Sequence, residues 1–154
     1  MDTVCLKALL AFAQKPDYIS IESEKISFRK LVEELDLLTE LGYTGFKAVE
    51  QKNISRQAEP NPSQEGPYLG YQFQEGSSGL FGKDLPGEWK NYRQIINEYR
   101  ITFLLYKLFG DYGKLKRFDR FFIGGKRGKL FSKLFGRTIP FWYDTHAKHR
   151  SVVS

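Results

Sequence analysis

DYISIES (17–23), SFRKLVEELDLLTELGY (27–43) and TGFKAVEQ (44–51) are the consecutive stretches that decide the fold. The first and the last are short runs rich in β-branched and aromatic residues, which is typical of strands. The middle stretch carries leucines at helical spacing; it begins at Ser27, a residue that favours helix starts, and ends at Gly42. Strand, helix and strand with short connections predict a βαβ unit with two parallel strands and a right-handed crossover.

Further elements are expected on both sides of this unit. Residues 2–15 are apolar on nearly every side, so they predict a helix that is buried on more than one face. LGYQF (69–73) predicts a third strand, and residues 89–110 predict a long helix. The polar, proline-containing stretch at 52–67 is expected to be an extended loop. The fold class is therefore α/β, with a sheet of about three strands and flanking helices.

The glycine-rich stretch GSSGLFG (76–82) lies between the predicted third strand and the long helix. It lacks the strand-to-helix setting of a dinucleotide-binding motif, because Pro86 and Gly87 interrupt the chain soon after it. Long or glycine-rich connections in compact domains are often functional. Two interpretations remain: a lid on the substrate side, or a flexible surface turn.

Charge is distributed unevenly along the 154 residues. Residues 1–100 contain 12 Lys and Arg against 15 Asp and Glu, whereas residues 101–154 contain 12 against 3. The basic segment KLKRFDRFFIGGKRGKLFSKLFGR (114–137) interleaves these cations with Phe and Leu. It could bind anionic lipid, bind single-stranded nucleic acid, or form a helical appendage whose Phe side chains pack on the domain. We therefore expect a domain at 1–110 and a basic, aromatic-rich helical extension at 111–154.

Composition narrows the class of protein. No stretch approaches about 18 uninterrupted apolar residues, which argues against a membrane-spanning helix. The first residues, MDTVCLKALLAFAQK, do not have the positively charged start of a secretory signal. Cys5 is the single cysteine, so no intrachain disulfide can form. We expect a cytoplasmic protein.

Both histidines of the chain lie in YDTHAKH (143–149). His146 is a candidate general base because histidine titrates near neutral pH, and Asp144 is close enough in sequence to orient it. Asp144, His146 and His149 could instead bind a metal ion from one face of a helix, although they would need remote ligands to complete the site. The third possibility is an ordinary surface terminus.

Five segments of the sequence occur in an informative order: CLKAL (5–9), KPDYISIE (15–22), LLTELGYTGFKAVEQ (37–51), GSSGLFGKDLPGEW (76–89) and WYDTHA (142–147). This ordered set resembles the carboxyl-terminal part of FkbM-type S-adenosylmethionine-dependent methyltransferases, over about residues 4–147. The resemblance implies part of a Rossmann-like methyltransferase sheet. It also implies methyl transfer from S-adenosylmethionine to a hydroxyl oxygen of a small molecule or sugar.

The resemblance has consequences for the cofactor. In this family the cofactor site lies in the amino-terminal half, in a glycine-rich turn after the first strand and an acid after the second, and neither occurs here. The resemblance therefore implies that this polypeptide begins just past the cofactor half. A chain of this kind is not expected to bind S-adenosylmethionine or to be active alone. It would also account for an apolar helix near residue 2 that has no strand before it to cover it.

The matched positions supply the candidate site residues. The resemblance implies that these positions face the substrate: Glu22, Gln51, Ser77, Ser78, Trp89, Asp144 and His146. Of these, His146 and Asp144 are the candidate catalytic residues because of their chemistry, and the other five are candidate substrate contacts. The alternative function is a non-enzymatic binding module that uses the basic segment to bind anionic lipid or nucleic acid.

Overall fold

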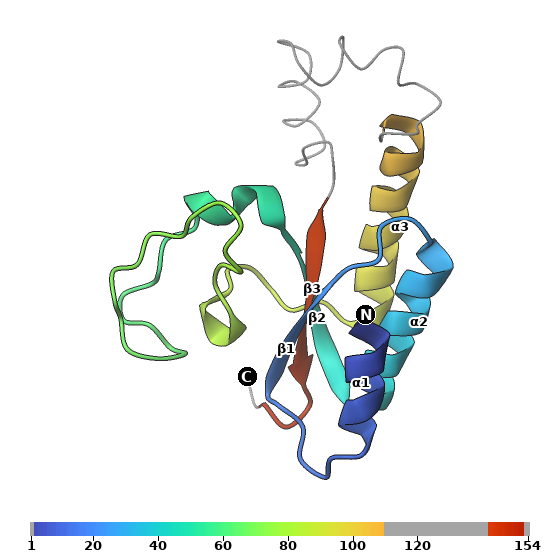
Figure 1. Ribbon diagram of the computed structural model, residues 1–154, viewed down its shortest axis with the longest axis horizontal. Coiled ribbons are helices and arrows are strands. Elements are labelled where there is room, and N and C mark those ends of the chain that lie inside the picture. The colour runs from blue at the N-terminus through green and yellow to red at the C-terminus, as the bar shows by residue number, and fades with distance from the viewer. Residues whose placement is uncertain (1, 110–141, 153–154) are drawn as a thin grey trace. The chain divides into compact units, whose positions relative to one another are not determined.

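A computed structural model describes residues 2–109 and 142–152 of the chain. The chain divides into two compact units, residues 1–96 with 142–154, and residues 97–141. The first unit contains α1 (Asp2–Leu10), β1 (Tyr18–Glu22), α2 (Phe28–Glu40), β2 (Tyr43–Glu50), the short 3₁₀ helices η1 (Gln51–Arg56) and η2 (Gly82–Asp84), and β3 (Tyr143–His149) (Figure 1). Helix α3 (Tyr92–Phe109) begins in the first unit and ends in the second.

The described part of the second unit is the carboxyl-terminal portion of α3. It confirms that the predicted long helix forms, with Tyr99, Thr102 and Leu105 as its buried residues. The predicted division of the chain at residue 110 stays a prediction, because most of the extension lies outside the described residues. The part of the extension that is described, residues 142–152, belongs to the first unit and contains a strand instead of the expected helix. Among the helices that the structure describes, none combines the length and the hydropathy needed to cross a bilayer.

The sheet has three strands in the order β1-β3-β2, and β3 is antiparallel to both neighbours. β1 and β2 therefore run in the same direction, as the βαβ pattern predicts, and helix α2 connects them. They do not pair with each other, because β3 lies between them. The α/β class is confirmed, whereas the third strand comes from residues 143–149 and not from 69–73.

Residues 69–73 do not form a strand. Leu69 is 76% exposed and Tyr71 is 51% exposed, so their side chains gain little from packing. Their backbone N–H groups donate to the carboxylate of Glu59 at 3.1–3.2 Å instead of to a neighbouring strand. Gln72 makes an isolated bridge to Ala58. The residues of this stretch favour strands, but they form one only where their side chains have a surface to pack against.

Helix α2 follows its sequence pattern closely. The hydroxyl of Ser27 accepts a hydrogen bond from the backbone N–H of Lys30 at 3.4 Å, which caps the helix as predicted. Gly42 follows the helix with a φ of +98°, a conformation that glycine adopts without steric cost. The apolar face is buried in the core through Leu31, Leu35 and Leu38.

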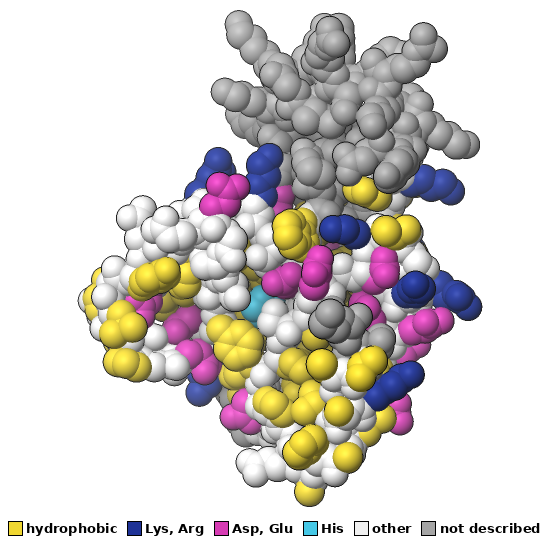
Figure 2. All heavy atoms as spheres, in the orientation of Figure 1, with side chains coloured by type: hydrophobic (Ala, Val, Ile, Leu, Met, Phe, Trp, Pro, Cys, Tyr) yellow, Lys and Arg dark blue, Asp and Glu magenta, His cyan; other side chains and the backbone are white. Residues whose placement is uncertain are grey.

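Helix α1 departs from its prediction. Leu6 is buried, with 1% exposed, but Val4, Leu10 and Phe12 of the helix and the turn after it are 71%, 44% and 61% exposed. Figure 2 shows hydrophobic side chains gathered over this part of the molecule. The expectation that the helix is buried on more than one face is therefore wrong within the described residues: one side of α1 packs inward, and the rest of its apolar surface remains open.

The two faces of the sheet have different surroundings. Strand residues that point to one face, such as Ile21, Phe46 and Ala147, are buried with the leucines of α2. Figure 1 shows α1 and α2 on this side of the sheet, and the long connection between η1 and α3 on the other. The second face, which this connection covers, carries the candidate site.

Candidate functional site

His146 lies at the centre of the sheet, on β3. Ser20 of β1 is directly opposite it on one side, and Lys47 of β2 is directly opposite it on the other. Residues that face each other across neighbouring strands project to the same side of a sheet. The imidazole therefore lies between a hydroxyl group and an ammonium group, on the face that the long connection covers.

The surroundings of His146 keep its ring neutral. The residue is 2% exposed, and the Phe81 ring lies 5.8 Å from the imidazole, centroid to centroid. Nε2 is 3.2 Å from the hydroxyl oxygen of Ser20, whereas Nδ1 is buried and has no hydrogen-bond partner among the described residues. Burial, assisted by the positive charge of Lys47, lowers the pKa of His146 to about 4. At pH 7 the imidazole therefore carries a lone pair on one nitrogen.

Glu22 and Asp144 are opposite each other one step further along the same face, toward the carboxyl end of β1. The sequence predicts that Asp144 orients the imidazole of His146, but in the structure Ser20 makes that contact. The physical reason is that residues two positions apart on a strand are about 6.6 Å apart, whereas a cross-strand neighbour is closer. Glu22 also lies 4.0 Å from the ammonium of Lys25, in an exposed ion pair.

Gln51 directly follows β2 and extends its hydrogen bonding, since its backbone N–H donates to the Trp142 carbonyl at 2.9 Å. By strand alternation its side chain belongs to the same face as Lys47. The side-chain nitrogen of Gln51 is buried and has no partner among the described residues. Two predicted site residues, His146 and Gln51, thus each hold a buried polar atom that nothing in the described chain satisfies, which is uncommon in folded proteins.

We call the side chains on this face the polar row; its members are Ser20, Glu22, Gln51, Asp144 and His146. Glu22 and Gln51 lie at the carboxyl ends of β1 and β2, at the same end of the sheet, with β3 between the two strands. Hydroxyl, carboxylate, amide and neutral imidazole groups can together bind several hydroxyl groups of one ligand. The row thus has the chemistry to hold a polyhydroxylated molecule.

Residues 80–90 cover this face, and Lys47 connects them to it. The buried Lys47 ammonium donates to the Leu85 carbonyl at 2.7 Å and lies 4.4 Å from the centroid of the Trp89 ring. Burial, and secondarily the nearby Lys148, lowers the pKa of Lys47 to about 8. Backbone hydrogen bonds in both directions between Phe46 and Lys90 hold the end of the segment on the edge of β2.

Trp89, a predicted substrate contact, makes extensive contacts within the protein. Its ring stacks on Tyr18 with centroids 5.6 Å apart and an interplanar angle of 28°. Lys47 and Lys148 both have their ammonium groups within 6.0 Å of its centroid. These contacts make Trp89 an anchor of the covering segment, and its binding of substrate stays a prediction.

Ser77 and Ser78, the remaining predicted substrate contacts, lie in a local turn. Both the backbone N–H and the hydroxyl of Ser77 donate to the carbonyl of Gln74, at 3.1 and 2.7 Å, and Ser78 is exposed. Within the described residues, the hydrogen bonds of these serines do not connect them to the polar row. Their role in binding stays a prediction, but the turn is held by its own contacts.

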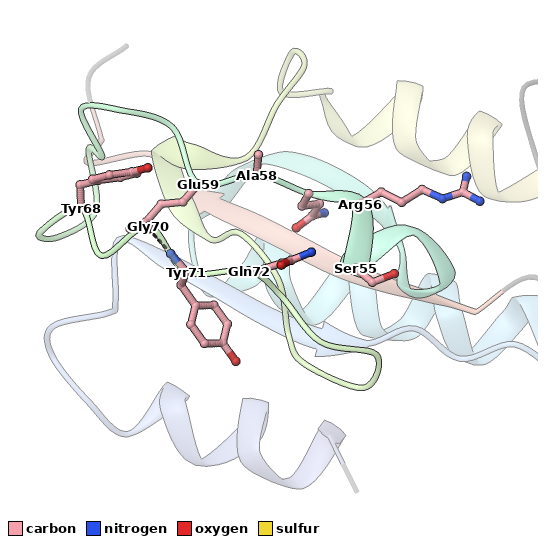
Figure 3. Close-up of a pocket in the computed structure, with 9 residues that line it drawn as sticks. Ser55, Arg56, Ala58, Glu59, Tyr68, Gly70, Tyr71 and Gln72 are labelled. Carbon is pink, nitrogen blue, oxygen red and sulfur yellow. Dashed lines mark hydrogen bonds between the residues drawn. The ribbon is translucent and has the colours of Figure 1, made fainter.

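A hollow of about 350 Å³ opens elsewhere, between the end of η1 and the loop near residue 70. Figure 3 shows Ala58 and Gln72 on two facing backbone segments, with the Tyr71 ring and the Arg56 guanidinium extending in different directions. The carboxylate of Glu59 is occupied by hydrogen bonds from the loop itself. The lining side chains do not converge, and members of the polar row do not line the hollow.

Two other interpretations of the sequence concern a metal site and the basic segment. His146 and His149 are three residues apart on a strand, so they point to opposite faces, and the helical spacing required for the metal site is wrong. Within residues 2–109 and 142–152 there is no cluster of three metal-binding side chains. The basic segment at 114–137, with its lipid and nucleic-acid interpretations, lies outside the described residues.

Sequence reasoning missed Lys47 as a member of the site and Ser20 as the partner of His146. The alternation of polar and apolar residues in YDTHAKH was the available signal, because it indicates a half-buried strand. Which residues lie opposite His146 depends on the register with β1 and β2, which local patterns do not determine.

Comparison with known proteins finds no match to this chain among protein-family models, curated proteins or solved structures.

Proposed function

We propose that this chain is the carboxyl-terminal, substrate-side part of an FkbM-type methyltransferase that acts in the cytoplasm on a hydroxyl group of a small molecule or sugar. The proposal is supported by the ordered segments that resemble this family, and by the position of the polar row. β1 and β2 are parallel, and Glu22 and Gln51 lie at their carboxyl ends. In open α/β sheets, ligands bind at these ends of the strands.

The observation that carries the proposal is the free Nδ1 atom of His146. The imidazole is neutral at pH 7, and the buried Nδ1 lacks a partner among the described residues. A ligand hydroxyl placed against Nδ1 can donate its hydrogen to this nitrogen, which makes His146 the general base of the proposed reaction. Because the pKa of His146 is about 4, the imidazole is a weak base. It therefore takes up the proton only when the hydroxyl oxygen has begun to lose electron density to its new bond.

The remaining members of the polar row bind the rest of the acceptor. Glu22 and Asp144 accept hydrogen bonds from neighbouring hydroxyl groups, and the side-chain nitrogen of Gln51 donates one. Residues 80–90 exclude water from His146, through Phe81 and the contacts of Trp89. An acceptor with several hydroxyl groups along one edge fits this set best.

S-adenosylmethionine would supply the methyl group, but the described residues do not fit this cofactor. The glycine-rich stretch does not join a strand to a helix, and two of its three glycines, Gly79 and Gly82, lie against other parts of the chain. A Cβ atom at Gly79 would lie 2.5 Å from Gln57, and one at Gly82 would lie 2.5 Å from Glu65. At these two glycines no space is open for a ligand. We therefore propose that the cofactor is bound by residues other than the described ones.

Titration calorimetry with S-adenosylmethionine tests the assignment of the cofactor. It compares this chain with the polypeptide encoded when the reading frame is extended upstream of the Met1 codon. We expect binding by the longer polypeptide and none by this chain. Saturable binding by this chain, or an upstream frame without a glycine-rich turn after a strand, would contradict the proposal.

Turnover by the longer polypeptide tests the role of His146. We expect His146→Gln to lower methyl transfer by at least 100-fold, the usual scale of general base catalysis. His149→Gln is the matched control, because His149 points to the opposite face of β3, and it should retain activity. Undiminished turnover in His146→Gln would remove this residue from the mechanism.

A further inference from the structure

Ser20 is the polar group that contacts the imidazole of His146. The two residues are directly opposite in the antiparallel pairing of β1 and β3, and Ser20 Oγ is 3.2 Å from Nε2. A serine hydroxyl can donate to a bare nitrogen or accept from a protonated one. The distance alone therefore leaves open which nitrogen of the neutral ring carries the hydrogen.

The surroundings of Nδ1 indicate which nitrogen of the imidazole carries the hydrogen. Nδ1 is buried and lacks a partner among the described residues. A buried N–H group without an acceptor is rarer in proteins than an acceptor without a donor. A hydrogen on Nδ1 would create such an orphaned donor, whereas a hydrogen on Nε2 is accepted by Ser20. The favoured tautomer thus has Nε2–H donating to Ser20 Oγ and a lone pair on Nδ1.

We propose that Ser20 is a positioning residue that holds His146 in the Nε2–H tautomer and so leaves the lone pair on Nδ1. The use of that lone pair as the proton acceptor rests on the proposed function, but the tautomer does not. Ser20 is exposed at the edge of the sheet, so its substitution creates no cavity in the core.

Long-range ¹H–¹⁵N NMR correlations of the imidazole test the tautomer directly in this chain at pH 7, without cofactor or turnover. His149→Gln provides the assignment of the His146 signals. We expect Nε2–H in the unsubstituted chain. Ser20→Ala should lower the ratio of Nε2–H to Nδ1–H about five-fold, which corresponds to one ordinary hydrogen bond.

Two further variants separate positioning from a general structural effect. Ser20→Thr keeps the hydroxyl and suits a strand, so it should restore the ratio. Ser23→Ala removes a hydroxyl from the same segment, one that contacts Thr145 at 2.8 Å on the opposite face, and it should leave the ratio unchanged. An Nδ1–H tautomer in the unsubstituted chain, or a ratio unaffected by Ser20→Ala, would overturn the inference. A correct tautomer with full turnover in His146→Gln would instead overturn the role of His146 as general base and leave the inference about Ser20 standing.

Discussion

Lys47 on β2 donates a hydrogen bond from its ammonium group to the backbone carbonyl of Leu85 at 2.7 Å. The same ammonium lies over the Trp89 ring, so one buried cation connects the sheet to the segment that covers His146. Within the described residues, Lys47 has no carboxylate in contact with it. A buried charge that is balanced only by a carbonyl and a ring is disfavoured, which is why burial dominates the shift of its pKa.

The first prediction concerns the alkaline side of the stability profile. The pKa of Lys47 is about 8 in the folded chain, against 10.5 when unfolded. Between these values the unfolded state binds more protons, so the free energy of unfolding should rise as pH increases through this window. We expect a contribution of about 1–3 kcal/mol from this residue, measured by urea unfolding from pH 7 to pH 9.5.

Matched variants isolate this contribution. Lys47→Met keeps most of the apolar stem and removes the titrating group, so the rise with pH should flatten. Lys83→Met removes an exposed lysine from the same covering segment and should leave the rise intact. A slope that is the same in Lys47→Met as in the unsubstituted chain would show that Lys47 titrates normally.

The second prediction concerns the acid side. The pKa of His146 is about 4 in the folded chain and 6.5 when unfolded, mainly because of burial. As pH falls from 6.5 toward 4, the unfolded state takes up the proton first, so stability should be lost over this range, by about 3 kcal/mol in total. Urea unfolding between pH 7 and pH 5 should show this slope.

His146→Gln removes the acid slope if the assignment is correct, and His149→Gln keeps it. The range above pH 5 avoids the carboxylates of Glu24 and Asp84, whose lowered pKa values place their titration at more acidic pH. An equal slope in both variants would mean that His146 is not the residue responsible.

The parts of the fold that were predicted correctly depend on local sequence. Ser27 caps α2, leucines at helical spacing bury one side of it, and Gly42 ends it, all within 16 residues. β3 was missed because a strand is stabilised by partners distant in sequence; His146 pairs with Ser20 and Lys47, more than 90 residues away. Residues 69–73 were predicted as a strand but do not form one, because their strand-favouring side chains lack a surface to pack on.

The candidate site could likewise be predicted from the sequence only in part. The direction of β1 and β2 follows from the βαβ pattern, so the placement of Glu22 and Gln51 at one edge could be predicted. The partner of His146 could not, because it depends on register, and a shift of one residue would turn the imidazole to the other face. Asp144 was predicted as this partner because it is close in sequence, whereas the partner in the structure is Ser20, which lies opposite His146 on the neighbouring strand.

The third prediction compares two leucines of α1. Leu6 is 1% exposed and Leu10 is 44% exposed. Leu6→Ala should lower the free energy of unfolding by about 2–4 kcal/mol, because it leaves a cavity. Leu10→Lys should change it by no more than about 0.5 kcal/mol, as is usual for exposed sites. Chemical denaturation of both variants measures this difference, and a large loss in Leu10→Lys would show that the outer surface of α1 is packed in this chain.

The Leu10→Lys variant also tests the proposed function. If a cofactor-binding body covers α1 in a longer polypeptide, Leu10→Lys should destabilise that polypeptide by more than about 1 kcal/mol, since it places a charge in an apolar interface. Equal stability of Leu10→Lys in the short and the longer chains would count against such a cover.

The fourth prediction concerns the carboxylate that holds the covering segment to the preceding loop. Asp84 accepts hydrogen bonds from the Ser63 hydroxyl at 2.8 Å and from the backbone N–H groups of Gln64 and Glu65 at 2.9 and 3.2 Å. Burial acts in the opposite direction, but these bonds hold the pKa of Asp84 below its usual value. Asp84→Asn keeps the size of the side chain but replaces one acceptor oxygen with a donor, so it should cost about 1 kcal/mol.

Limited proteolysis measures this loss where it occurs, because cleavage within residues 60–90 follows local opening of the loop. We expect cleavage there to be several-fold faster in Asp84→Asn than in the unsubstituted chain. Glu88→Gln, at an exposed position of the same segment, is the control and should be cleaved at the original rate. If both variants were cleaved alike, the Asp84 carboxylate would not be what orders the loop. The cover over His146 would then depend on the other contacts of the segment, such as those of Lys47, Trp89 and Lys90.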